Sequence, residues 1–72
     1  MHPSTANIMR YFEHEHLRPG PLQSTSRMFW ALAHDMVQLL PEGPELTACL
    51  RKLLEAKDCA VRAALDLPRE GE

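Results

Sequence analysis

The sequence predicts an all-α fold in which a short N-terminal helix precedes an antiparallel hairpin of two longer helices. Two stretches carry apolar residues at helical spacing, a turn rich in proline and glycine separates them at 41–44, and no stretch shows the alternation of a β-strand. A chain of 72 residues is the size of one small domain, so residues 1–72 are taken as a single unit.

The short helix is predicted over residues 5–16. Thr5 can cap its start, and apolar side chains such as Ile8 and Phe12 would form its buried side. The segment should end before 19–21, because the sequence Pro-Gly-Pro opposes helix continuation.

The next helix is predicted over residues 24–40, with three successive candidate caps in Ser24, Thr25 and Ser26. It is apolar nearly all round. The residues that can face the longer helix are Phe29, Leu32, Ala33, Met36, Val37 and Leu40. The apolar residues left pointing elsewhere are Met28, Trp30 and Leu39, and such an exposed patch usually marks an interface.

The longest helix is predicted over residues 44–67, because Pro44 suits a first helical position. The charged tail at 68–72 should be frayed. The apolar seam of this helix, interrupted only by Lys57, consists of Leu46, Leu50, Leu53, Ala60, Ala64 and Leu67. One short hairpin buries little surface, so we expect a homo-oligomer, at least a dimer and more readily a hexamer.

Composition excludes several classes of function. The net charge of −2 and the pI near 6.0 argue against a protein that binds DNA or RNA polymers. No apolar run of membrane-spanning length and no signal-peptide pattern is present, so we expect a cytoplasmic protein without a membrane partner. His14 and His16 are two apart and would face different ways on a helix, so no metal or other cofactor is expected.

No catalytic residue is predicted, because no nucleophile has a base or an orienting acid at a suitable spacing. Instead, Arg27 lies beside the hydroxyls of Ser24 and Ser26 at the expected start of a helix. Free backbone N–H groups, hydroxyls and an arginine together can hold a phosphate. The alternative is that the serines only cap the helix and that Arg27 is a solvated surface residue.

Aromatic side chains precede this segment. Tyr11, Phe12 and His14 could stack on nucleobases, although ordinary packing would also explain them. Lys57 is unusual because its helical neighbours are apolar. It either extends its ammonium group to solvent or faces a cavity between subunits that holds an anion.

Four motifs within residues 10–66 resemble a known family. They are Tyr11-Phe12-Glu13-His14 before a proline-containing loop, the helix RMFWALAHDMVQLL, the turn PEGPE, and the block LRKLLEAKDCAVRAAL. Together they resemble the phage anti-CBASS sponges, proteins that sequester cyclic oligonucleotide messengers and share their helical-hairpin domain with an anti-Thoeris sponge. The resemblance rests mainly on apolar spacing, with Leu50, Leu53, Ala56 and Ala60 at the corresponding places.

The resemblance implies a compact hexamer, a trimer of interlocked dimers, that binds cyclic dinucleotides between protomers. Some family members also bind cyclic trinucleotides, and they sequester the messenger without cleaving it. The family's stacking aromatic falls on or near His14, where its usual tyrosine is replaced, so Tyr11 or Phe12 could stack instead. Its phosphate-binding cation falls near Arg27, and a shorter preceding loop leaves Ser26 as an alternative position.

Three functions therefore stay open. The first is a phage-type immune-evasion protein that sequesters cyclic dinucleotides, with cyclic trinucleotides as a second ligand class, in the host cytoplasm if a phage encodes it. The second is a helical oligomerisation or protein-interaction module with no nucleotide ligand. The third and weakest is an enzyme that acts on the same messengers.

Overall fold

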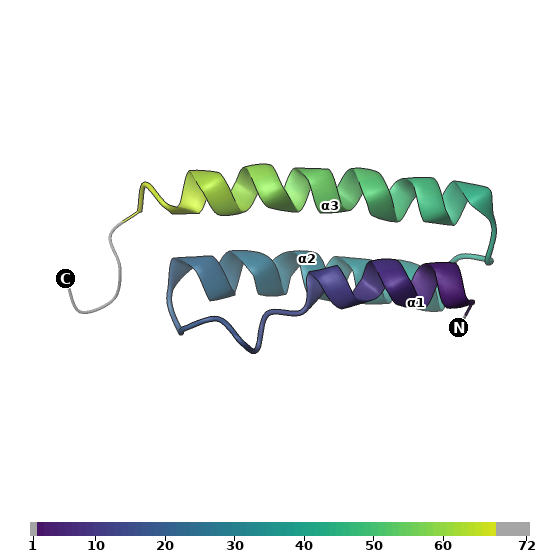
Figure 1. The fold of residues 1–72 in the computed structure, drawn as a ribbon, viewed down its shortest axis with the longest axis horizontal. Helices are drawn as coiled ribbons and strands as arrows, with labels where there is room; N and C mark the ends of the chain where they lie inside the picture. The colour runs from purple at the N-terminus through teal and green to yellow at the C-terminus, as the bar shows by residue number, and fades with distance from the viewer. Residues whose placement is uncertain (1, 68–72) are drawn as a thin grey trace.

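The computed structural model describes residues 2–67; Met1 and residues 68–72, where the frayed tail was expected, lie outside the described residues. The elements are α1 (Pro3–Met9), the 3-10 helix η1 (Arg10–Phe12), α2 (Pro21–Leu39) and α3 (Pro44–Ala64). Helices α2 and α3 lie side by side, and α1 contacts both near the turn that joins them (Figure 1). The predicted all-helical class is confirmed for residues 2–67, which contain no strand.

Both long helices begin at a proline that follows a glycine. Pro44 starts α3 as predicted, but α2 starts at Pro21 and not at residue 24. The first N–H group of a helix has no intrahelical partner, so a proline there loses no hydrogen bond. The preceding Gly20 adopts a φ of 138°, which side chains disfavour. The other ends of α2 and α3 fall at Leu39 and Ala64, slightly before the predicted ends.

The N-terminal helix is shorter than predicted. His2 and not Thr5 caps it, because the Nδ1 atom of His2 accepts a hydrogen bond from the backbone N–H of Ser4 at 3.1 Å. After Phe12 the backbone becomes extended at Glu13. The next residues, 13–16, are all charged or histidine, so they offer no apolar side that would bury against α2 or α3.

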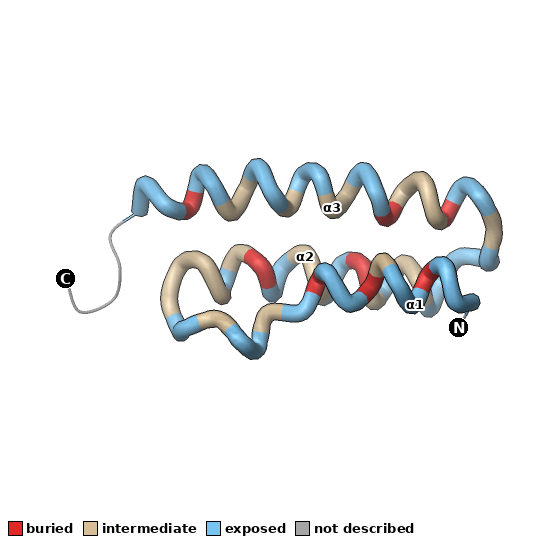
Figure 2. Tube along the Cα trace, in the orientation of Figure 1, coloured by how far each residue is buried: buried red, intermediate tan, exposed pale blue. Residues whose placement is uncertain are grey.

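The hydrophobic core lies where α1 and η1 meet the two long helices (Figure 2). Its buried members are Met9, Phe12, Ala33, Leu46 and Leu50. Phe12 and Leu50 are fully buried. Leu32 was expected to face α3 but is 47% exposed, because the neighbouring Ala33 occupies the buried face of α2.

A carboxylate fastens α1 to the turn between α2 and α3. The hydroxyl of the buried Thr5 donates a hydrogen bond to Glu42 Oε2 at 2.7 Å, and the backbone N–H of His2 donates to Glu42 Oε1 at 3.2 Å. These two hydrogen bonds, the one from Thr5 foremost, lower the pKa of Glu42 below its usual value of 4.5. The short α1 is therefore held at its start by a residue distant in sequence.

This contact predicts a pH dependence of stability. Because the pKa of Glu42 is lower in the folded state, its contribution is present above the unfolded pKa of 4.5 and is lost as the pH falls through the folded pKa. The Tm should therefore decrease less steeply between pH 7 and pH 3 for Glu42→Gln than for the parent. The glutamine keeps an acceptor for the Thr5 hydroxyl. Glu45→Gln is the control. Equal slopes for all three proteins would contradict this role of Glu42.

Candidate functional site

A cleft of about 300 Å³ lies between the segment after η1, α2 and the second half of α3. We call it the Lys57 cleft. Its lining residues are Glu13, His16, Leu17, Ser26, Lys57, Asp58, Val61 and Arg62. Two of the residues singled out in the sequence, Ser26 and Lys57, therefore meet in one cavity although they lie on different helices.

Ser26 supplies an unpaired hydroxyl to this cleft. The residue is 1% exposed, and its Oγ atom has no hydrogen-bond partner among the described residues. A buried hydroxyl left unpaired costs about 1–3 kcal/mol. The Oγ atom is covered in the free protein, so a ligand oxygen would recover that cost after a small side-chain movement that uncovers it.

Lys57 supplies a cation that is partly removed from water. Its Nζ atom donates a hydrogen bond to the carbonyl oxygen of Tyr11 and lies 5.8 Å from the ring centroid of Phe12. Burial lowers the pKa of Lys57, while Asp58 acts in the opposite direction. An ammonium group has three donors, so two remain for other acceptors. An anion in the cleft would meet a partly desolvated cation, which moderately strengthens the attraction.

The other charged residues of the cleft are of both signs. Arg62 and His16 add further donors, whereas Glu13 and Asp58 are carboxylates. Arg62 is exposed, and its Nη2 atom donates to the Sγ atom of Cys59 at 3.4 Å, so its remaining donors are available to a ligand. The cleft thus suits a ligand that presents both anionic oxygens and hydrogen-bond donors.

The phosphate site proposed around Ser24, Ser26 and Arg27 does not form at the start of a helix. Because α2 begins at Pro21, these residues lie beyond its first turn, and the backbone N–H of Ser24 donates to the carbonyl of Gly20 at 2.9 Å. Ser24 and Arg27 are exposed and do not line the Lys57 cleft. Of these three residues, only Ser26 lines the same cleft as Lys57.

The two aromatic residues of η1 have different surroundings. Phe12 is fully buried in the core, so the assignment of its ring as a stacking surface is corrected. Tyr11 is 55% exposed, and the guanidinium carbon of Arg10 lies 5.3 Å from its ring centroid. The Arg10 Nη2 atom donates to the Tyr11 hydroxyl at 3.4 Å, which lowers the pKa of Tyr11. Tyr11 alone of this pair can offer its ring to a ligand.

His14 belongs to a stack of three rings. It meets Trp30 edge to face at 5.4 Å between centroids, and Trp30 stacks on His34 at 4.5 Å. The Nδ1 atoms of both histidines are buried without a hydrogen-bond partner among the described residues. A second hollow of about 260 Å³ is lined by Glu13, His14, Glu15 and Trp30. Glu13 borders both this hollow and the Lys57 cleft, so the two are adjacent.

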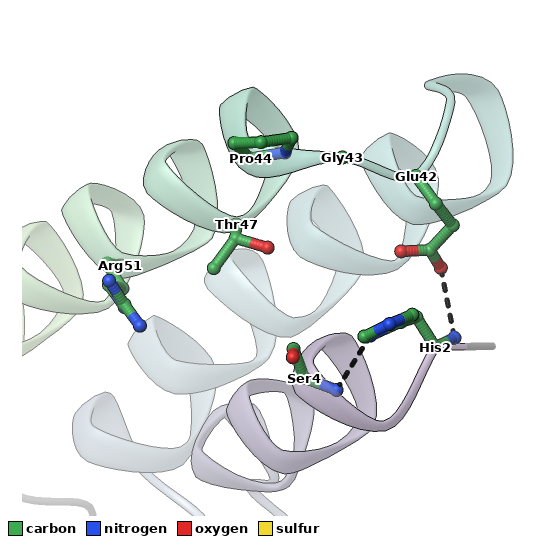
Figure 3. A pocket seen from close by; sticks show the side chains of 7 residues that line it. All are labelled: His2, Ser4, Glu42, Gly43, Pro44, Thr47 and Arg51. Atoms are coloured by element: carbon green, nitrogen blue, oxygen red, sulfur yellow. Dashed lines mark hydrogen bonds between the residues drawn. The ribbon is translucent and has the colours of Figure 1, made fainter.

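A third cavity, of about 370 Å³, lies near the turn between α2 and α3 (Figure 3). It is lined by His2, Ser4, Glu42, Gly43, Pro44, Thr47 and Arg51. Its carboxylate, Glu42, already accepts hydrogen bonds from His2 and Thr5, and none of its side-chain polar atoms is buried without a partner. Although this cavity is larger, the Lys57 cleft has the chemistry that favours a ligand.

Comparisons with protein-family models, with characterised proteins and with solved structures find no match for this chain. Within residues 2–67, no three His, Cys, Asp or Glu side chains converge closely enough to hold a metal ion. No helix in this part of the chain combines the length and the hydropathy of a membrane span.

Most residues that line the Lys57 cleft and the hollow beside His14 were not assigned to a site from the sequence. Trp30 was taken only as an interface residue, although it lines the hollow beside His14. Glu13, His16 and Arg62 were not assigned to a site, although they line the Lys57 cleft. For Arg62 a signal existed, because it lies four residues after Asp58 and therefore on the same side of α3.

Proposed function

We propose that the protein binds a cyclic oligonucleotide in the Lys57 cleft and sequesters it without cleaving it. The observation that carries this proposal is the meeting of an unpaired buried hydroxyl, Ser26, with a partly desolvated ammonium group, Lys57. A phosphodiester would accept hydrogen bonds from both groups, and Arg62 would add a further donor. Cyclic dinucleotides are the first candidates, and cyclic trinucleotides are the second.

The adjacent hollow supports a nucleotide over a simple anion. With a phosphate in the Lys57 cleft, an attached base would reach the rings of His14 and Trp30 on the other side of Glu13. Stacking of a base on such rings contributes about 1–3 kcal/mol. Tyr11 could add an exposed ring at the backbone carbonyl that Lys57 already contacts.

The proposed action is binding without catalysis. Among residues 2–67, Ser26 has no hydrogen-bonded base, and His16 lines the same cavity. Without a base to remove its proton, a serine hydroxyl is a weak nucleophile. Binding alone would keep a messenger from its effector, which is the action that the resemblance to anti-CBASS sponges implies. The proposed place of action is the host cytoplasm, if a phage encodes the protein.

The proposed functional unit is a homo-oligomer of the α2–α3 hairpin. Large apolar side chains remain exposed on the single chain, among them Met28, Leu39 and Leu65 at 66%, 82% and 58%. Burying them against further copies would provide the core that one small domain lacks. A dimer is the minimum, and the resemblance favours a hexamer.

A melting-shift screen of cyclic di- and trinucleotides tests the proposal. A ligand present at about 100 times its Kd stabilises the folded state by about 2.7 kcal/mol, which raises the Tm of a domain of this size by roughly 10 °C or more. The matching linear dinucleotide and inorganic phosphate are the controls. Release of intact ligand from the heat-denatured complex would distinguish sequestration from cleavage, and no shift with any cyclic nucleotide would reject the function.

The second candidate function is an interaction module without a nucleotide ligand. The exposed apolar residues of α2 favour it, because they need a partner whether or not the cleft binds anything. The same screen separates the two candidates. An oligomer that shows no melting shift, and whose assembly does not depend on Lys57, would support the module.

A further inference from the structure

The exposed residues of α2 form one continuous face of that helix. They are Ser24, Arg27, Met28, Ala31, Leu32, Asp35, Gln38 and Leu39, and their spacing of one and three residues is that of a single helical side. Single exposed apolar residues are common, but here three large ones share one face, with exposures of 66%, 47% and 82% for Met28, Leu32 and Leu39. We call this surface the outer face of α2.

Two charges of opposite sign lie on the outer face at equal distances from its centre. Arg27 and Asp35 are each four residues from Ala31, which is about 6 Å along the helix axis in either direction. Neither side chain takes part in a side-chain hydrogen bond among residues 2–67. Both charged groups are therefore available to a partner outside the described part of the chain.

This arrangement is complementary to itself. If a second copy packs antiparallel, with the two-fold axis at Ala31, Arg27 of each copy faces Asp35 of the other, and two ion pairs form. A parallel copy would place like charges together, which is unfavourable. A different partner protein would have no need of charges placed symmetrically about one residue.

The side chains near this axis suit a helix contact. Ala31 is small, so the two helices could approach to the 8–10 Å typical of packed pairs. Met28 and Leu32 flank it and would be covered by the second copy. Ser26 lies on the buried side of α2, away from the outer face, so the contact would leave the Lys57 cleft open.

We propose that two copies of this chain associate through the outer face of α2, antiparallel about Ala31, with reciprocal Arg27–Asp35 ion pairs. The inference rests on the self-association proposed above and names the surface that performs it. It assigns Arg27 to assembly and leaves anion binding to the cleft.

A charge-exchange experiment tests the inference. Sedimentation equilibrium of the full chain should show the Kd of self-association rise about tenfold or more in Arg27→Asp and in Asp35→Arg. In the double variant, Arg27→Asp with Asp35→Arg, both pairs are restored with reversed polarity, so the Kd should return to within about threefold of the parent. Salt should weaken the parent and the double variant alike.

A second pair of variants tests the apolar part of the surface. Leu32→Gln should weaken self-association, whereas Leu65→Gln, at an exposed leucine of α3, should not. A helical circular dichroism spectrum verifies that each variant is folded. An oligomeric parent whose single charge variants are unaffected would place the interface elsewhere and overturn the inference. A monomeric parent at millimolar concentration would overturn self-association itself, and nucleotide binding measured in parallel would show whether the cleft proposal survives.

Discussion

Replacing Phe12 with alanine should leave the protein largely unfolded. The ring is fully buried where η1 meets α2 and α3, and its removal would leave a cavity among the core residues. Such substitutions cost about 3–5 kcal/mol, whereas small domains have a total stability near 5 kcal/mol. Urea denaturation followed by circular dichroism would measure the loss.

Tyr11→Ala is the matched control for this prediction. Tyr11 is the neighbouring aromatic residue, is 55% exposed and has its hydroxyl bonded only to Arg10 among the described residues. Removal of the Tyr11 ring should change the urea concentration at the unfolding midpoint only slightly. If Phe12→Ala unfolds at the urea concentration of the parent, then the N-terminal segment does not complete the core, and the ring would become available to a ligand after all.

The fold class could be predicted because apolar spacing is a local property. The seam of α3 predicted Leu46 and Leu50 as buried residues, and both are in the core. The start of α2 was missed for a specific reason. Pro21 was interpreted as part of a helix-breaking loop, whereas a proline at the first position of a helix loses no hydrogen bond. The same reasoning that placed Pro44 correctly would have placed Pro21.

The candidate site was less predictable because it depends on contacts between distant segments. Lys57 was noticed for its apolar neighbours, but its hydrogen bond to the Tyr11 carbonyl, 46 residues away, has no signature in helical periodicity. Ser26 was assigned to a phosphate site at the start of a helix, with capping as the alternative, whereas the earlier start of α2 makes it part of the buried wall of a cleft. The assignment of Arg27 to a phosphate rested on the expected helix start near residue 24 and on the family resemblance.

The loop between η1 and α2 is likewise held by contacts that sequence periodicity does not predict. The side-chain amide of Gln23 donates to the carbonyl of Leu17 at 2.9 Å and approaches the carbonyl of His14 at 3.5 Å. These contacts hold the loop that supplies His16 and Leu17 to the cleft. A glutamine in a helix has many possible partners, so sequence patterns could not have shown which carbonyls it would bind.

Replacing Lys57 with methionine should abolish most nucleotide binding while leaving the protein folded. Methionine keeps much of the aliphatic length that packs near the Phe12 ring, but it removes the ammonium group from the cleft. A charge-assisted hydrogen bond to a phosphate contributes about 1.5–3 kcal/mol, so the Kd should rise at least about tenfold. Calorimetric titration with the cyclic dinucleotide that gives the largest melting shift would measure it.

The matched control is Lys52→Met, which removes the same charge from an exposed position on α3 outside the cleft. Equal losses in both variants would mean that only net charge matters, and the cleft would be rejected as the site.

The pH dependence of nucleotide binding provides an independent check. Anion binding needs protonated Lys57, and burial lowers the pKa of this group below 10.5, so the parent's affinity should decline at alkaline pH before an exposed lysine would titrate. In Lys57→Met the residual binding should lack this decline. A parent whose affinity is constant up to pH 10.5 would show that the Lys57 ammonium group does not hold the anion.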